Sequence, residues 1–315
     1  MIGKMVVSRL FLAVVTLLAV SVLIFWMAEV LPGDIAVRVL GRESTEQARQ
    51  AFREKLHLDR PLHQRYLIWL TGVARGDFGK SLTSDRQVTD VVLPRLRNTL
   101  LVGGLAFILY IPVTIILASL AAIFRDRPTD GIISVATLVG LSMPEFVSGT
   151  ILMFLFAVTI PIFPVMSLVD KADTPLEMLR TLALPAITLM IIMAVYAIRM
   201  MRDNLIEVLD SEYVRMAELK GLPRSKVIIR HALPNAIIPA LNVTALNLAY
   251  LIGGVVLVER VFSYPGMGSL LVDSILLRDV PVIEAVVLIV AAIYILSNVF
   301  ADVMTIVVNP KLRSG

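Results

Sequence analysis

The sequence contains no cysteine, which excludes a disulfide framework, a thiolate nucleophile and any metal site built from cysteine ligands. Charged residues are also scarce. They make up 17% of the 315 residues, whereas soluble globular domains have about 25%. The formal net charge of +4 is too small to indicate a nucleic-acid partner. The three histidines, His57, His63 and His231, are not spaced as a metal-binding motif.

Apolar residues are in excess, at 57% of the chain with a mean hydropathy of +0.84. They are concentrated in runs long enough to cross a bilayer, which is typical of a membrane protein rather than of a large soluble core. Six such spans and their connections use nearly all of the chain, which leaves no room for an attached nucleotide-binding domain. We therefore predict an all-α polytopic membrane protein with six transmembrane helices.

The predicted spans are residues 10–28, 99–124, 132–159, 182–198, 236–258 and about 282–308. The basic residues before the first run also fit a signal peptide. That alternative is disfavoured because the run exceeds the usual 7–15 residues and no small-residue cleavage site follows it. The polar stretch between the first two spans is expected to form helical pieces outside the bilayer.

These spans divide the chain into four parts. We predict a first transmembrane helix at 1–31, an outer segment at 32–97, a five-helix core at 98–310 with a cytoplasmic loop at 202–235, and a cytoplasmic tail at 311–315.

Basic residues fix the predicted orientation through the positive-inside rule. With the N-terminus inside, the inner segments hold thirteen Lys and Arg, whereas the short outer loops hold only Lys171, Arg180, Arg260 and Arg278. The long first outer segment holds twelve more, but segments beyond about 60 residues are largely exempt from the rule. Both termini are therefore expected in the cytoplasm.

Residues 74–81, Ala-Arg-Gly-Asp-Phe-Gly-Lys-Ser, come close to a nucleotide-binding P-loop. That motif needs glycine at the position of Ala74, and a strand before it and a helix after it so that amides converge on a phosphate. No strand signal precedes this stretch, and the orientation places it outside the cell. We therefore do not expect a nucleotide site here.

The segment 202–235 is strongly charged and lies between two long apolar runs. Good helix formers occupy 213–220, Gly221 follows at a C′ position, and Pro223 prevents continuation. A second short helix is expected at 225–233, where a proline ends it. This pattern predicts a helix–turn–helix unit that a cytoplasmic partner can grip, with basic residues Arg215, Lys220, Arg224, Lys226 and Arg230.

The spacing of Ala217, Gly221, Leu233 and Pro234 resembles the EAA loop of ABC-transporter permeases, E-A-A-x₃-G-x₉-I-x-L-P. Arg215 and Met216 replace its first Glu and Ala, and His231 replaces its Ile. The form Tyr-Val-Arg-x-Ala-x-x-Lys-Gly-Leu is typical of the dipeptide, oligopeptide and nickel permeases.

Shorter matches to that family follow in order along almost the whole chain, at 31–34, 58–62, 66, 76–77, 98–100, 142–146, 184–189, 264–268 and 278–281. Ile35 and Asn309 depart from the usual Pro and Asp. Together these matches resemble the B-type (DppB/OppB-like) subunit of the permease pair.

The resemblance implies a type I (MetI-like) importer subunit in the bacterial inner membrane. Its implied partners are a paralogous C-type permease, two cytoplasmic ABC ATPase subunits, an extracytoplasmic solute-binding protein and membrane lipids. No cofactor is expected on this chain, because ATP and Mg would be bound by the ATPases, so the subunit itself would not be an enzyme. The residues implied in ATPase coupling are Arg215, Met216, Ala217, Glu218, Lys220, Gly221, Leu222, Pro223, Arg224, Leu233 and Pro234.

Polar groups inside spans are functional candidates, because an unpaired charge near the bilayer centre costs about 2.5–3.5 kcal/mol or more. Glu145 lies near the middle of the third span, just after Pro144, and either faces the translocation pathway or pairs with another group for structural reasons. Ser142 and Asn247 are further pathway candidates, although Asn247, like Asn242 and Asn298, also fits a hydrogen bond between helices.

The leading functional hypothesis is an ATP-driven importer subunit for short peptides. Nickel, glutathione, opines or another small solute are alternatives within the same class. A proton-coupled secondary transporter with Glu145 as proton carrier is a different class, and a membrane scaffold without transport is another.

Overall fold

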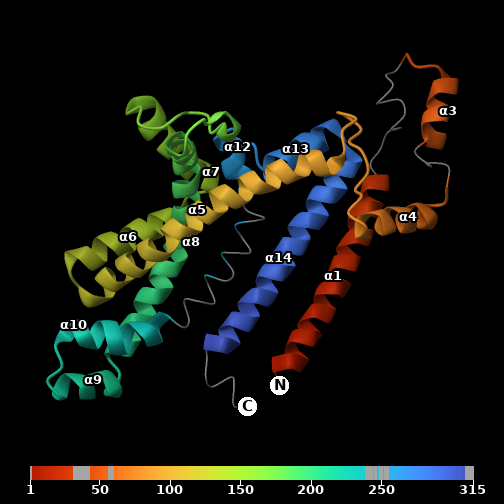
Figure 1. Cartoon of the computed structure of the whole chain (residues 1–315). Coiled ribbons are helices and arrows are strands. Elements are labelled where there is room, and N and C mark those ends of the chain that lie inside the picture. The colour runs from red at the N-terminus through yellow and green to blue at the C-terminus, as the bar shows by residue number, and fades with distance from the viewer. Residues whose placement is uncertain are drawn as a thin grey trace.

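The computed structural model describes residues 2–30, 43–55, 60–237, 244, 247, 251 and 255–308. The regular elements of these residues are helices, apart from a single β-bridge between Lys80 and Gln87. The all-α prediction is therefore confirmed. Long helices run between two ends of the molecule, and short helices gather at each end (Figure 1).

Four described helices are long and apolar enough to cross a membrane, namely α1 (Ile2–Val30), α5 (Val88–Ile123), α8 (Pro175–Leu209) and α14 (Val280–Val308). A fifth candidate is a bent pair, α6 (Pro128–Ser142) and α7 (Glu145–Met153), which the π-helical turn Phe154–Thr159 extends. These elements coincide with five of the six predicted spans. The predicted span 236–258 lies largely outside the described residues, so the count of six stays a prediction.

The ends of the long helices and the short helices gather at two ends of the molecule. The start of α1, the end of α14 and the pair α9 (Glu212–Leu219) and α10 (Arg224–Val227) lie toward one end of the molecule (Figure 1). The helices α3 (Glu46–Lys55), α4 (Leu62–Ala74) and α13 (Met267–Leu277) lie toward the other end. Which of the two ends faces the cytoplasm stays a prediction from the basic residues.

The main core lies between α5 and α8. It contains the buried side chains of Val102, Ala106 and Tyr110 from α5 and of Leu189 and Met193 from α8, and α12 (Val255–Val261) adds others. Small residues let the two long helices approach closely, as is usual in membrane bundles.

Two helices extend further than the apolar runs predicted. α5 begins at Val88 rather than 99, and α8 covers Pro175–Leu209 rather than 182–198. Thr174 and Glu177 form a reciprocal capping box at the start of α8, which apolar content does not reveal. With 35 residues, α8 is about 52 Å long. It therefore exceeds a hydrocarbon core of about 30 Å and extends beyond it.

The outer segment is helical in pieces, as predicted, and α4 packs on the outer end of α1. The rings of Phe25, Tyr66 and Trp69 have centroids 5.5–6.0 Å apart, and the Ser21 and Tyr66 hydroxyls are 2.8 Å apart. The stretch 259–281 differs from its prediction as a loop, because α13 occupies much of it.

The near-P-loop at 74–81 follows the helix α4 and not a strand. The Ser81 hydroxyl donates a 2.5 Å hydrogen bond to the Asp279 carboxylate, and the amides of Leu82 and Thr83 donate to the same group at 3.1 and 3.2 Å. A carboxylate of the chain therefore occupies the donors of this turn and joins the outer segment to the start of α14.

The loop 264–268 is closed around the buried carboxylate of Glu259. This group accepts the Thr99 hydroxyl at 2.7 Å and the Ser269 amide at 2.8 Å. A β-carbon on Gly266 would lie only 1.9 Å from Glu259 Oε1. An added methyl group would therefore displace this carboxylate from its hydrogen bonds, and the loop ties α12 and α13 to α5.

We predict that Gly266→Ala destabilises the subunit by about 1–3 kcal/mol, because either the hydrogen-bonded Glu259 carboxylate or the loop must shift to admit the methyl group. The matched control is Gly131→Ala, where an added β-carbon meets nothing within 4 Å. Thermal unfolding of the two purified variants checks this, and equal midpoints would contradict it.

Single-cysteine variants test the orientation, since the natural chain has no cysteine. Ser225 on α10 and Lys171 in the outer segment are both exposed. We expect a membrane-impermeant maleimide to label Ser225→Cys only in inverted vesicles and Lys171→Cys only in right-side-out vesicles. The reverse pattern would disprove the orientation.

Candidate functional site

The predicted coupling segment forms a hairpin, which consists of α9, the turn 220–223 and the helical stretch 224–237. Gly221 follows α9 in the left-handed conformation, with φ +75°. Its amide donates to the Glu218 carbonyl at 2.9 Å, and the Leu222 amide donates to the Ala217 carbonyl at 3.4 Å. These two bonds form a Schellman motif, in which glycine avoids the steric cost that a β-carbon has at positive φ. The predicted end of the first helix is confirmed.

The second half of the hairpin departs from its prediction. After α10 the backbone widens into the π-helical turn Ile228–Ala232 (η3) and continues as helix through residue 237. The expected stop at Pro234 is therefore wrong. A proline normally clashes with the carbonyl four residues earlier, and the wider π turn directly before Pro234 makes room for it.

The face of the hairpin that packs against α8, here called its inner face, is apolar and buried. Val214 and Ala217 on α9, Val227 on α10 and Ala232 on η3 form one cluster with Leu205 near the end of α8. Two of three connected hydrogen bonds link the two arms, both through Tyr213, and the third lies within the second arm. The Asn235 side chain donates to the Tyr213 hydroxyl at 3.0 Å and to the His231 carbonyl at 2.9 Å, and the Tyr213 hydroxyl donates to that carbonyl at 3.4 Å. The hairpin is therefore attached to α8 as one unit.

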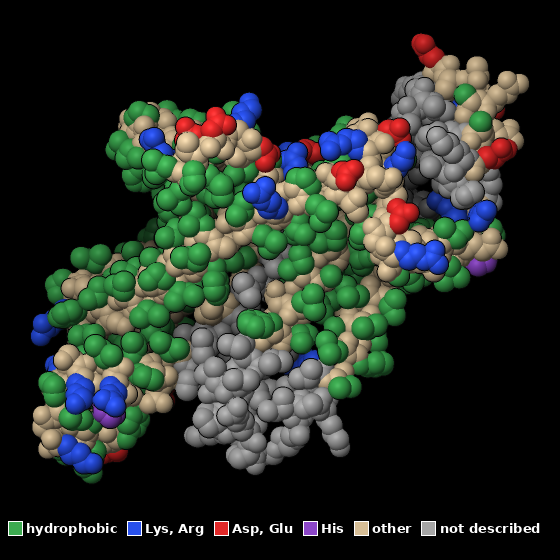
Figure 2. Space-filling model, viewed as in Figure 1, with side chains coloured by type: hydrophobic (Ala, Val, Ile, Leu, Met, Phe, Trp, Pro, Cys, Tyr) green, Lys and Arg blue, Asp and Glu red, His purple; other side chains and the backbone are tan. Residues whose placement is uncertain are grey.

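The outer face of the hairpin, which is the face turned away from α8, carries exposed apolar and basic groups. Leu219 is 76% exposed, Ile229 67% and Met216 56%. Lys and Arg side chains gather over α9 and α10 at the lower left of Figure 2. Exposed basic residues on this face are Arg215, Lys220, Arg224, Lys226 and Arg230. The combination of apolar groups and one sign of charge is suited to a protein surface with acidic residues.

The predicted coupling residues divide between these two faces. Arg215, Met216, Glu218, Lys220 and Gly221 are exposed. So are Pro223, Arg224 and Pro234, whereas Ala217 is buried. Leu222 and Leu233 are partly buried against the inner cluster, so neither is free to insert fully into a partner. Sequence reasoning missed Leu219 and Ile229, although their places on the faces opposite Ala217 and Val227 could have revealed them.

The third predicted span is broken where the sequence placed the interruption. The axes of α6 and the α7 segment differ by 111° at Met143 and Pro144. Glu145 is the first residue of α7 and is half-buried. Among the described residues, no donor lies within hydrogen-bond distance of its carboxylate. Ser142 is exposed, and its hydroxyl donates to the Leu138 carbonyl at 2.9 Å.

Asn247 is held between two helices. Its side-chain amide donates to the Tyr110 hydroxyl of α5 at 3.3 Å and to the Met193 carbonyl of α8 at 3.1 Å. The Tyr110 and Thr244 hydroxyls are also 3.0 Å apart. The geometry therefore assigns Asn247 an interhelical bond, and these bonds run to α5 and α8 rather than to the break at Glu145.

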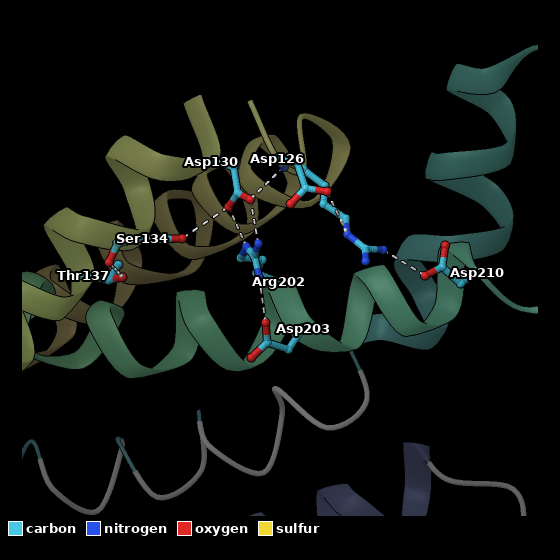
Figure 3. Close-up of polar contacts among 8 residues, drawn as sticks. Asp126, Asp130, Ser134, Thr137, Arg202, Asp203 and Asp210 are labelled. Atoms are coloured by element: carbon cyan, nitrogen blue, oxygen red, sulfur yellow. Dashed lines mark hydrogen bonds and ion pairs between the residues drawn. The ribbon is translucent and has the colours of Figure 1, made fainter. Parts of the chain in front are cut away.

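A buried ion pair that sequence reasoning did not identify lies between α6 and α8 (Figure 3). Arg202 Nε donates to Asp130 Oδ1, and Arg202 Nη2 donates to Asp130 Oδ2, each at 2.6 Å. Asp130 is 5% exposed. An acid in the first turn of α6 and an arginine at the end of an apolar run were visible in the sequence, but nothing there indicated that they meet.

Comparison with known proteins covers nearly the whole chain. Residues 114–314 match the family described as binding-protein-dependent transport system inner membrane component, and residues 1–103 match the N-terminal model of such components. A protein of Brucella melitensis biotype 1 that carries the name peptide transport system permease is 35% identical over 314 residues, covering 99% of both chains. The glutathione transport system permease protein of Salmonella choleraesuis is 35% identical over 308 residues, covering 98% of both.

These matches confirm the resemblance that the hairpin motif and its flanking motifs indicated. The apolar helices agree with the family's place in the bacterial inner membrane. The chain therefore belongs to the family of multi-pass inner-membrane permease subunits of binding-protein-dependent ABC importers.

Proposed function

We propose that this permease imports short peptides, driven by ATP hydrolysis on partner subunits. The observation that carries the proposal is the cytoplasmic hairpin, whose inner face is buried on α8 and whose outer face is exposed. The names of the two relatives support the substrate class, since one refers to peptides and the other to glutathione, which is itself a short peptide.

The family implies ATPase and solute-binding partners. We further propose that a paralogous C-type permease forms the second half of the pathway and that each permease contacts one of two ATPases. ATP and Mg are bound by those ATPases, and this chain contributes no catalytic group. In this arrangement Met216, Leu219 and Ile229 would enter a groove on the ATPase, and the basic residues would pair with acids at its rim.

Transmission of the ATPase movement requires a hairpin that does not bend. The turn at Gly221 is fixed by two backbone hydrogen bonds, and Pro223 lies at the start of α10. A push on the outer face would therefore move α8 rather than be absorbed in the turn.

The broken span is the proposed pathway element, with Ser142, Pro144 and Glu145 at the break. The Glu145 carboxylate is half-buried and has no partner within the described residues. A peptide amino group passing through the pathway would supply the opposite charge. Asn247 would hold neighbouring helices in place rather than contact the peptide.

Reconstitution of the complete complex tests the proposed function. We expect uptake of labelled di- to pentapeptides into proteoliposomes only with both permeases, the ATPases, the binding protein and ATP. A proton-coupled transporter would instead show uptake with this chain alone in a pH gradient. That result, or ATP-driven uptake of Ni²⁺ but not of peptides, would contradict the proposal.

We expect peptide uptake by Gly221 variants to decrease as the substituted residue becomes less able to adopt positive φ. We expect Gly221→Asn to keep most of the activity, Gly221→Ala to lose part of it, and Gly221→Pro to abolish uptake, because proline cannot adopt φ +75°. Uptake is measured in complexes shown to contain the variant subunit. Normal uptake with Gly221→Pro would contradict the coupling role.

Removal of the Glu145 charge should weaken transport of cationic substrates. We expect Glu145→Gln to reduce uptake of a peptide with a free amino terminus by about tenfold, which is the order of one lost charge contact. Uptake of the same peptide with an acetylated amino terminus should change less. Equal effects on both peptides would remove the proposed contact.

A further inference from the structure

The Asp130–Arg202 pair has a single defined geometry. Each oxygen of the Asp130 carboxylate accepts two donors. Oδ1 accepts Arg202 Nε at 2.6 Å and the Ser134 hydroxyl at 3.2 Å, and Oδ2 accepts Arg202 Nη2 at 2.6 Å and the Asp126 amide at 3.1 Å. A bidentate pair with all acceptor positions occupied resists rotation as well as separation. It can therefore transmit movement in any direction.

The two residues connect the hairpin with the broken span. Arg202 lies seven residues before the end of α8, which is about 10 Å along the helix axis. The apolar cluster that fixes the hairpin begins at Leu205, within one turn of Arg202. Asp130 is the third residue of α6, and the other end of α6 is the break that precedes Glu145.

A second contact fixes α6 against α8 near that break. A β-carbon on Gly140 would lie only 2.6 Å from Val195 Cγ1, so the two helices touch there without space for a side chain. A helix that contacts its neighbour at one point can pivot about that point. A helix that is fixed at two separated points must move with its neighbour. The ion pair at one end and Gly140 near the other therefore make α6 move with α8.

A neighbouring ion pair lacks these properties. Arg125 Nη1 lies 3.0 Å from Asp210 Oδ2, and this pair joins the α5–α6 turn to the end of α8. Its side chains are 49% and 69% exposed, compared with 22% and 7% for Arg202 and Asp130. Exposed pairs of this kind contribute little. The Arg125–Asp210 pair is therefore a matched control in the same region.

We propose that Asp130 and Arg202 are positioning residues that transmit movement of the cytoplasmic hairpin to the broken span α6–α7. This inference rests on the proposed function. The pair touches neither the substrate nor ATP. It determines how much transport follows from each ATP hydrolysed.

A merely stabilising role predicts a different result. If the pair only held the fold together, its loss would lower the amount of assembled complex, and the complex that remained would transport normally for each ATP. If it transmits movement, an assembled complex would continue to hydrolyse ATP while uptake fell. The ratio of uptake to ATP hydrolysis distinguishes these roles.

The experiment uses the complete reconstituted complex, with cysteine-free partners. We expect Asp130→Asn to lower the ratio of peptide uptake to ATP hydrolysis by about tenfold, and Asp210→Asn to leave it within about twofold. A wild-type complex without uptake would reject the proposed function itself. An active wild-type complex with an unchanged ratio in Asp130→Asn would reject only this inference.

Cross-linking of the two positions tests whether a physical link between α6 and α8 is sufficient without the ion pair's charges. The double variant Asp130→Cys, Arg202→Cys should have the same low ratio, and a short bifunctional methanethiosulfonate joining the two thiols should restore it, reversibly with dithiothreitol. A monofunctional reagent should not. Confirmed cross-linking without recovery would overturn the proposal, as would failure of both Asp130→Asn and the double variant to assemble, since the pair would then serve folding.

Discussion

Burial of Val214, Ala217 and Val227 against Leu205 joins the hairpin to the last turns of α8. Full burial of a side chain such as Val214 is worth about 1.5–3 kcal/mol. The exposed ion pair Arg125–Asp210 contributes about 0–1 kcal/mol, and it joins the α5–α6 turn rather than the hairpin to α8. Apolar packing therefore decides whether the hairpin follows α8. The basic residues of the outer face remain available for a partner.

Most buried carboxylates of the helical bundle described here have an ionic or hydrogen-bond partner. Asp130 is paired with Arg202, and Glu259 accepts the Thr99 hydroxyl and the Ser269 amide. Charges inside a membrane protein are normally satisfied in this way, because the bilayer offers no water to replace a lost partner. Glu145 differs, since no described residue satisfies its carboxylate. That contrast is the reason for testing Glu145 as a substrate contact.

Much of the architecture could be predicted from local sequence. Long apolar runs predicted five spans that the structure describes. Gly221 predicted the turn of the hairpin, and Pro144 predicted the break in the third span. Helix ends were predicted less well. The capping box at Thr174 and the charged first turns of α5 extend helices beyond the apolar residues that mark a span.

Contacts between distant residues could not be predicted from one sequence. The pairing of Asp130 with Arg202 and of Ser81 with Asp279 depends on how helices pack, and no local pattern encodes it. Pro234 shows a second limit. Its usual effect is to end a helix, but the π turn Ile228–Ala232 accommodates it, and such a turn has no clear sequence signal.

The central claim is that the outer face of the hairpin is gripped by an ATPase while its inner face moves α8. Photo-cross-linking from a benzoylphenylalanine at Leu219, the most exposed apolar residue of α9, tests this most directly in the assembled, transporting complex. The account predicts capture of an ATPase subunit, with a yield that changes between the nucleotide-free and ATP-bound states. A transporting complex in which this position captures only lipid or the partner permease would contradict it.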